Sequence, residues 1–143
     1  MSRFFVGNDH AGLSLKSAVV AHLLQAGHEV VDLGAQENVS CDYPDFAIAV
    51  AARVAAGEGM GILVCGTGQG MAMAANRIHG VRAAVCADSF SARATRLHND
   101  ANVLCLGERV VGVGVALGIV DAFVAAEFEG GRHQRRIAKF DLR

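Results

Sequence analysis

One stretch near the middle of the 143-residue chain reads Gly61-Ile62-Leu63-Val64-Cys65-Gly66-Thr67-Gly68-Gln69-Gly70, and an alanine-rich segment of residues 71–76 follows it. The apolar run predicts a buried strand, the glycines predict a sharp turn, and the alanines predict a helix. Such a turn aims backbone N–H groups at an anion, beside the positive end of the helix dipole. A cysteine in that field ionises more readily, so we expect Cys65 to act as a thiolate base or nucleophile.

The same alternation of apolar runs and helix-length segments continues along the whole chain. Strands are predicted at residues 4–6, 30–33, 61–64, 81–86 and 102–106. Helices are predicted at residues 13–25, 45–56, 71–78, 90–97 and 113–123. Strands joined by crossover helices pair in parallel, and the helices cover both faces of the sheet. The sequence therefore predicts a three-layer α/β/α sandwich around a five-stranded parallel sheet.

Composition restricts the class of protein. With 52% hydrophobic residues and no long linker, residues 1–143 are expected to form one domain, including a helical C-terminal segment of about residues 130–143. The 13 basic and 14 acidic residues give no general reason to expect nucleic acid or a membrane as partner. No apolar segment reaches about 18 residues, and the N-terminus becomes polar too early for a signal peptide, so we expect a cytoplasmic protein.

The four cysteines, Cys41, Cys65, Cys86 and Cys105, lie about 20 residues apart, without the close pairs typical of a metal site. Cys86 and Cys105 end or lie in apolar runs and are predicted to be small buried hydrophobic residues. The same interpretation would suit Cys65 if it were taken alone.

Polar residues follow the predicted strands, and ligands of parallel sheets bind at the carboxyl ends of strands. Asp9 and His10 follow the first strand, Cys65 the third, and Arg109 the fifth, so we expect these groups to converge. His98-Asn99-Asp100 instead precedes the fifth strand, at the opposite edge of the sheet. That placement suggests that a neighbouring subunit supplies it.

The glycine-rich turn also has an alternative interpretation as a nucleotide site. Gly66 and Gly68 begin a dinucleotide fingerprint, and Asp88 falls about 20 residues later, where a ribose-binding acid belongs. Against this, the third glycine is displaced to Gly70, and the motif follows the third strand. Nucleotide binding is therefore the minor interpretation.

Five segments occur together: Gly7-Asn8-Asp9-His10-Ala11-Gly12, Asp42-Tyr43-Pro44-Asp45, Cys65-Gly66-Thr67-Gly68-Gln69-Gly70-Met71, Arg96-Leu97-His98-Asn99-Asp100-Ala101-Asn102-Val103-Leu104 and Gly130-Gly131-Arg132-His133-Gln134-Arg135-Arg136. In this order and spacing they resemble type B ribose-5-phosphate isomerase, whose relatives include galactose-6-phosphate and allose-6-phosphate isomerases. The resemblance covers nearly the whole chain. It implies a Rossmann-like α/β/α fold, aldose–ketose isomerisation, and a homodimer or dimer of dimers with active sites at the subunit interface.

The resemblance further implies a reaction through an enediolate that needs no metal or other cofactor. Cys65 would be the base, Thr67 and the backbone N–H groups of residues 66–70 would stabilise the anion, and His98 would assist ring opening. One branch of the family carries a glutamate base at the position of Met71. Because methionine cannot accept a proton in this way, the chain is placed in the cysteine branch.

Further residues are implied to bind the substrate. Asp9 and Asn99 would bond sugar hydroxyls, and Tyr43 would line the pocket. The remaining substrate-binding residues implied are His10, Gly66, Gly68, Gln69, Gly70, Arg109, Arg132 and Arg136. Arg132 and Arg136 are four apart, so on a helix they share one face and can grip a phosphate. Arg135 and His133 are interpreted as solvated surface residues, and Gln69 has no assigned role.

Ribose 5-phosphate, converted to ribulose 5-phosphate in the pentose phosphate pathway, is the expected substrate because it is central to the family. Galactose 6-phosphate, allose 6-phosphate, a tetrose phosphate and a free rare sugar are the alternatives. A non-catalytic sugar-phosphate-binding subunit is the competing class. The intact set of Asp9, Cys65, Thr67, His98 and Arg132 favours the enzyme.

Overall fold

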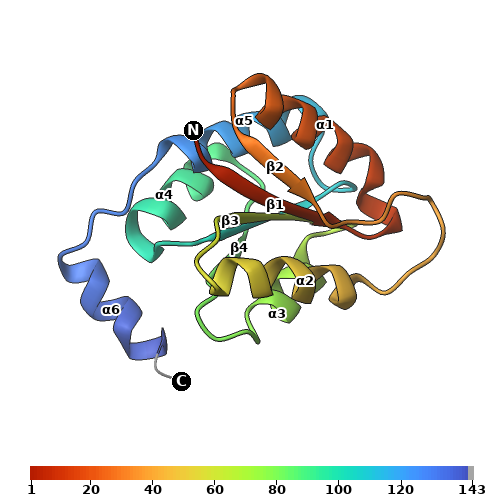
Figure 1. The fold of residues 1–143 in the computed structure, drawn as a ribbon. Coiled ribbons are helices and arrows are strands. Elements are labelled where there is room, and N and C mark those ends of the chain that lie inside the picture. Colours follow the sequence, from red (N-terminus) through yellow and green to blue (C-terminus); the bar gives the residue numbers. More distant parts are fainter. Residues whose placement is uncertain (142–143) are drawn as a thin grey trace.

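The computed structural model describes residues 1–141 and contains a five-stranded sheet whose neighbouring strands are all parallel (Figure 1). The strands are β1 (Arg3–Asn8), β2 (Glu29–Asp32), β3 (Met60–Cys65), β4 (Ala83–Val85) and β5 (Val103–Gly107), in the spatial order β2-β1-β3-β5-β4. The helices are α1 (Leu13–Gln25), α2 (Tyr43–Ala55), α3 (Gln69–Ala75), α4 (Ser89–Asn99), α5 (Val113–Ala125) and α6 (Arg132–Asp141). The predicted α/β sandwich with a five-stranded parallel sheet is confirmed.

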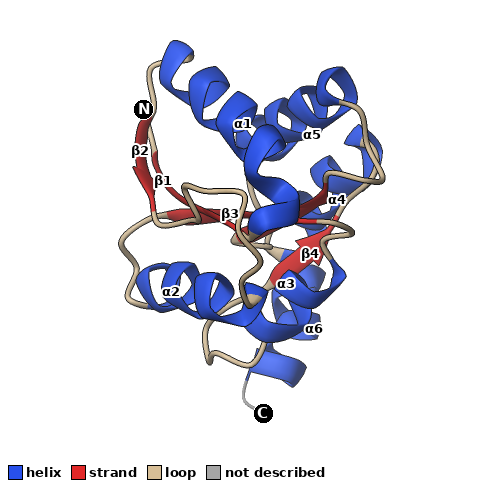
Figure 2. Ribbon diagram, turned by 90° about the vertical axis from the view of Figure 1, so that its right-hand side faces the viewer, coloured by secondary structure: helices blue, strands red, loops and turns tan. Residues whose placement is uncertain are grey.

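Helices cover both faces of the sheet (Figures 1 and 2). Successive side chains of β1 point to opposite faces, so Phe4 and Val6 pack in the core beneath α1 and α5, whereas Phe5 packs in the core beneath α2 and α3. All three side chains are fully buried. A strand buried on both faces needs a continuous apolar run, which is why the central strands were visible in the sequence.

Several element boundaries differ by a few residues from those predicted, and three of the differences have a local cause. Helix α2 begins at Tyr43 rather than residue 45, with Pro44 in its first turn, where a missing N–H costs nothing. Helix α3 begins at Gln69 rather than residue 71, because Gly68 takes a left-handed conformation (φ 80°) and caps it. Strand β4 is shorter than residues 81–86, since the Arg82 N–H donates to the Asn102 side chain at 2.7 Å instead of to a strand.

Helix α6 lies outside the sandwich and packs against α4 (Figure 1). Gly130 and Gly131, both with positive φ, turn the chain into it. Its buried residues, His133 and Ile137, are four apart and so share one face. Residues 142 and 143 of the predicted C-terminal helical segment lie outside the described residues. Within residues 1–141, every helix is too short or too polar to cross a membrane.

The turn after β1 is held directly against the end of β3. The Asp9 N–H donates to the Val64 carbonyl at 3.3 Å. Gly12, which precedes α1, approaches the same carbonyl so closely that an added Cβ would lie 2.5 Å from its oxygen. This position therefore admits only glycine without a shift of the backbone.

Replacing Gly12 with alanine is expected to lower the free energy of unfolding by about 1–3 kcal/mol, because the new methyl group overpacks a backbone contact. Gly118→Ala is the matched control. Gly118 lies inside α5, and its nearest neighbour to an added Cβ, the Ser89 Oγ, is at 3.6 Å. That variant should gain about 0.5–1 kcal/mol from helix propensity. Urea denaturation followed by circular dichroism measures both, and equal stability of Gly12→Ala and the parent chain would contradict the expectation.

Candidate active site

The order of the strands places a ligand site between β1 and β3. From β1 the chain adds β2 on one side, then crosses over to add β3 on the other. The loops after two strands that diverge in this way leave a crevice at their carboxyl ends. A cavity of about 370 Å³ opens there, lined by Asp9, His10, Ala11, Tyr43, Cys65, Gly66, Thr67, Gly70 and Arg109. The structure thus brings together the residues predicted at the ends of the first, third and fifth strands.

Cys65 is the last residue of β3 and is 6% exposed. Its Sγ accepts the N–H of Gly68 at 3.1 Å. That donor points at the sulfur because Gly68 is left-handed, a conformation that glycine adopts without strain. The turn thus aims a backbone donor at the sulfur atom that is predicted to take the proton.

Two of the five N–H groups predicted to face an anion are used inside the turn itself. The Gly68 N–H bonds Cys65 Sγ, and the Gln69 N–H donates to Thr67 Oγ1 at 3.3 Å. The expectation for residues 66–70 is therefore corrected for these two donors, whose direct partner is the thiol or the hydroxyl. Met71, by contrast, is fully buried in the core below the turn.

Asp9 and His10 are fixed by the chain around them. Asp9 is 6% exposed, and its Oδ1 accepts the Ala11 N–H at 3.0 Å, capping the short 3-10 turn His10–Gly12. Nδ1 of His10 accepts the backbone N–H of Cys41 at 3.2 Å. A neutral His10 in this arrangement carries its proton on Nε2, which makes that nitrogen a donor. The sequence did not predict that Cys41 supports the site. The contact forms only because the loop of residues 33–42 folds back onto His10, 31 residues away in the chain.

Tyr43 and Arg109 form two walls of the cavity against glycines of the turn. The ring of Tyr43 lies where a Cβ at Gly70 would be 2.5 Å from Cζ. The Arg109 side chain lies over Gly66, and the backbone N–H of Arg109 donates to the Gly66 carbonyl at 3.0 Å. Glycine at position 70 lets the Tyr43 ring close onto the turn, whereas a Cβ at Gly66 would make only ordinary contact with Arg109, 3.4 Å from its nearest atom.

Glu108 supports the cavity from outside the predicted set. Its carboxylate accepts the Leu15 N–H at 2.5 Å, across 93 residues of sequence. This bond caps the start of α1 and ties the loop that carries Arg109 to the helix that follows His10. In the sequence, the only indication of such a role was that Glu108 follows the fifth predicted strand.

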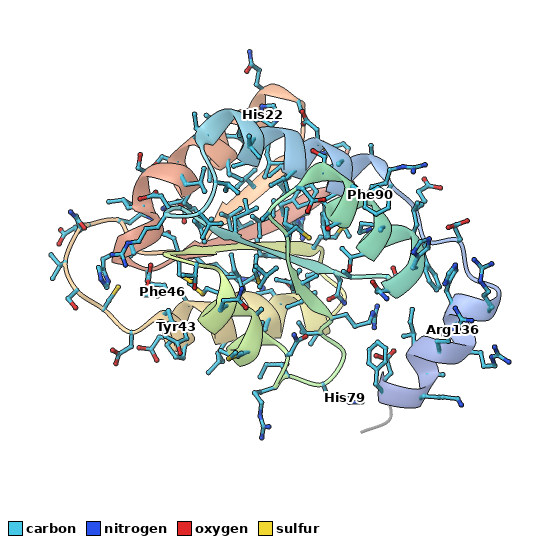
Figure 3. All side chains as sticks on the ribbon, turned by 180° about the vertical axis from the view of Figure 1, so that it is seen from behind. His22, Tyr43, Phe46, His79, Phe90 and Arg136 are labelled. Atoms are coloured by element: carbon cyan, nitrogen blue, oxygen red, sulfur yellow. The ribbon has the colours of Figure 1, made fainter. Side chains whose placement is uncertain are left out.

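Four other predicted site residues lie far from this cavity. His98 and Asn99 are the last residues of α4, and Arg132 and Arg136 are exposed on α6. Figure 3 shows Tyr43 and Arg136 at opposite ends of the molecule. The expectation that His98 and Asn99 sit at the other edge of the sheet agrees with this placement. The predicted site residues of one chain therefore fall into two half-sets. The first half-set lines the cavity and includes Asp9, Cys65 and Arg109, and the second lies on α4 and α6 and consists of His98, Asn99, Arg132 and Arg136.

The second half-set has its own supports, which the sequence did not indicate. Asp100 ends α4 in a left-handed conformation (φ 47°), and its carboxylate contacts Arg96 at 2.8 Å and Arg82 at 3.2 Å. His133 was interpreted as a solvated surface residue, which is wrong. It is 6% exposed, and its ring stacks on His98 with centroids 4.5 Å apart. His133 is buried because α6 packs on α4. The neighbouring basic residues in the sequence gave no indication of this packing.

The geometry weakens the nucleotide interpretation. Asp88, which would bind a ribose, caps α4 instead: its Oδ1 accepts the Ser91 N–H at 2.6 Å and its Oδ2 the Ser91 hydroxyl at 3.0 Å. The glycine-rich turn follows β3 rather than β1, and α3 after it has only 7 residues.

Residues 4–140 match the model of the ribose/galactose isomerase family. The chain belongs to this family. It is 50% identical over 138 residues to ribose-5-phosphate isomerase B of Escherichia coli K12, covering 96% of this chain and 93% of that protein. The crystal structure of a ribose 5-phosphate isomerase from Thermotoga maritima superposes with a TM-score of 0.97 at 45% identity, covering 99% of each chain.

A second solved structure, ribose-5-phosphate isomerase B of Mycoplasma genitalium with bound ribulose 5-phosphate, superposes with a TM-score of 0.95. Its identity to this chain is 46%, and the match covers 98% of this chain and 94% of that one. The family resemblance expected from the five sequence segments is confirmed.

The four thiols are expected to differ in reactivity toward iodoacetamide at pH 7.5. Burial, aided by the charge of Asp88, raises the pKa of Cys86 to about 11, and burial also raises the pKa of Cys105. Both should stay protonated and unreactive, whereas Cys65, at a cavity and bonded to an N–H, and the half-buried Cys41 should be alkylated. Peptide mass spectrometry over time follows each site. Labelling of Cys105 as fast as Cys65 would contradict this ranking.

Proposed function

We propose that the protein is an aldose–ketose isomerase that interconverts ribose 5-phosphate and ribulose 5-phosphate. The observation that carries the proposal is Cys65 Sγ, bonded by the Gly68 N–H at 3.1 Å, in a cavity beside Asp9 and Arg109. Family relatives that share about half of its residues are named for this reaction. A phosphorylated sugar does not diffuse through membranes, which favours a cytoplasmic location.

The residues divide the reaction into steps. The Cys65 thiolate takes the proton from C2 of the open-chain aldose, which leaves an enediolate, and returns it to C1. Between the two transfers the hydroxyl proton passes from O2 to O1, so that C2 becomes the carbonyl carbon of the ketose. Negative charge on the enediolate oxygens is met by the Thr67 hydroxyl, which lies at the cavity wall. The carboxylate of Asp9 accepts hydrogen bonds from sugar hydroxyls, and Tyr43 closes the pocket over the ring carbons. The proposed steps use only groups of the protein.

The remaining groups act from a second copy of the chain. His98, for ring opening, lies on α4, and Arg132 and Arg136, for the phosphate, lie on α6. Figure 3 shows Arg136 at the other end of the molecule from Tyr43. A homodimer in which α4 and α6 of one chain cover the Cys65 cavity of the other would complete the site. His10 and Arg109 would then face the phosphate from the chain that supplies the thiol.

Cys65→Ala is expected to reduce kcat for ribose 5-phosphate by about 10²–10⁴-fold, because the proton-transfer group is lost. The KM should change little, since the phosphate contacts are untouched. Formation of ribulose 5-phosphate measured by absorbance, with circular dichroism to verify the fold, tests this. Cys86→Ala, which removes a thiol outside the cavity, should keep full activity. Unchanged turnover by Cys65→Ala would overturn the assignment of the base.

Mixing two inactive variants tests whether two chains share a site. Cys65→Ala and His98→Asn disable different half-sets, so a hetero-dimer of the two contains one intact site. After co-refolding at equal amounts, about a quarter of the wild-type activity should return, as random pairing of a symmetric dimer requires. Cys65→Ala mixed with Asp9→Asn, both from one half-set, should recover none. Absence of recovery in the first mixture, with hetero-dimers verified by mass spectrometry, would exclude a shared site.

A further inference from the structure

His98, Glu129 and His133 form a compact cluster away from the Cys65 cavity. They come from the end of α4, the segment before α6 and the first turn of α6, respectively (Figure 1). One nitrogen or oxygen atom from each lies within 4.8 Å of the others. Nε2 of His98 is 3.4 Å from Oε1 of Glu129, and the Glu129 N–H donates to the Leu97 carbonyl at 3.1 Å, which fixes the segment against α4.

His133 is the buried member of the cluster. It is 6% exposed, and its Nε2 has no hydrogen-bond partner within residues 1–141. A buried ring nitrogen normally has a partner, so an unpaired one indicates a ligand that completes it.

We propose that His98, Glu129 and His133 bind one Zn²⁺ ion, or a similar divalent transition metal. Two imidazoles and one carboxylate are a donor set that zinc uses in proteins, with a fourth position open to water. Magnesium and calcium prefer oxygen ligands, so the two imidazoles select against them.

The side chains can close around an ion of this size. Zinc bonds of about 2.0–2.1 Å place tetrahedral ligand atoms roughly 3.3 Å apart, so the three donors must move inward from their present spacing. The rings of His98 and His133 are stacked, with 20° between their planes, so their nitrogen lone pairs run side by side and His98 must turn out of the stack to point a lone pair at the ion. The side chains of His98 and Glu129 are 45% and 52% exposed, which leaves them room to rotate. Arg132 and Arg136 oppose a cation nearby, but both are exposed and their charges are screened by solvent and salt.

The site would inhibit the enzyme, a consequence that rests on the proposed role of His98. An imidazole nitrogen bonded to zinc cannot accept or donate a proton during ring opening. Zinc would therefore act as a reversible inhibitor that engages the half-set of α4 and α6 rather than the thiol. A chelator should restore activity.

Binding is tested first, on the purified full chain without reference to activity. Titration calorimetry with zinc chloride at pH 7.5 should give one ion per chain. Glu129→Gln removes an exposed ligand without disturbing the core. It should weaken zinc binding by at least about tenfold, because even the loss of a residue that only hydrogen-bonds a metal ligand commonly has an effect of that size. Glu127→Gln, an exposed acid two residues away, is the matched control and should bind as the parent does. Cys65→Ser should also keep the ion.

Either of two results would overturn the site: a parent chain that binds no stoichiometric zinc, or a Glu129→Gln chain that binds it as tightly as the parent. His133→Gln gives an independent test of the buried ligand, with thermal unfolding as a check of its fold. It too should weaken binding by about tenfold or more. Retained affinity in a folded His133→Gln chain would equally refute the site.

The activity assay is separate. Zinc should inhibit ribose 5-phosphate isomerisation by the parent and by Glu127→Gln, whereas Glu129→Gln should need at least about tenfold more zinc. If the parent binds zinc through this cluster but loses no activity, the metal site stands and the inhibitory role is refuted. If the parent binds zinc but isomerises no sugar phosphate, the proposed function fails and the metal site stands. Inhibition that persists unchanged in Glu129→Gln would place the inhibitory ion elsewhere and refute the inhibitory role.

Discussion

The ends of three parallel strands are locked together by backbone hydrogen bonds, and the cavity depends on them. The Asp9 N–H donates to the Val64 carbonyl, and the Glu108 N–H donates to the Cys65 carbonyl at 2.9 Å. These bonds join the loops after β1 and β5 to the end of β3, so each polar side chain starts from a fixed backbone. Because the backbone N–H and C=O groups of these segments bond one another, the polar side chains are not needed as their partners and are available to a ligand. A glycine at each close approach, at positions 12 and 107, allows the loops to touch.

The same topology explains why one chain separates two half-sets of polar residues. Every strand is parallel, so every loop that follows a strand is at one edge of the sheet, and every helix that precedes a strand ends at the other. Cys65 follows β3, whereas His98 precedes β5. No local adjustment could bring their side chains together within the sandwich. The proposed mechanism, which uses both, therefore calls on a second copy of the chain. Helix α6 extends beyond the sandwich and presents its arginines on the outside.

The sequence predicted features that depend on local pattern. The apolar runs of β1, β3 and β5 are buried on both faces, and the glycine-rich turn is specified by residues that are adjacent in the chain. It could not predict contacts between distant segments. Glu108 caps α1 across 93 residues, Cys41 orients His10 across 31, and His133 is buried only because α6 packs on α4. The start of β4 differs from the prediction for the same reason, since the Asn102 side chain accepts the N–H of Arg82, directly before the strand.

The thiols show how position within one sheet sets chemistry. Cys105 lies inside β5, between Leu63 of β3 and Val85 of β4, where complete burial raises its pKa and keeps it neutral. Cys65 is only one strand away, but it is the last residue of β3, and the chain turns at Gly68 to aim an N–H at its sulfur. A distance of two residues along the strand direction thus separates a thiol among apolar neighbours from a thiol that faces a backbone donor. The glycine-rich turn, rather than the cysteine itself, sets the surroundings of Cys65.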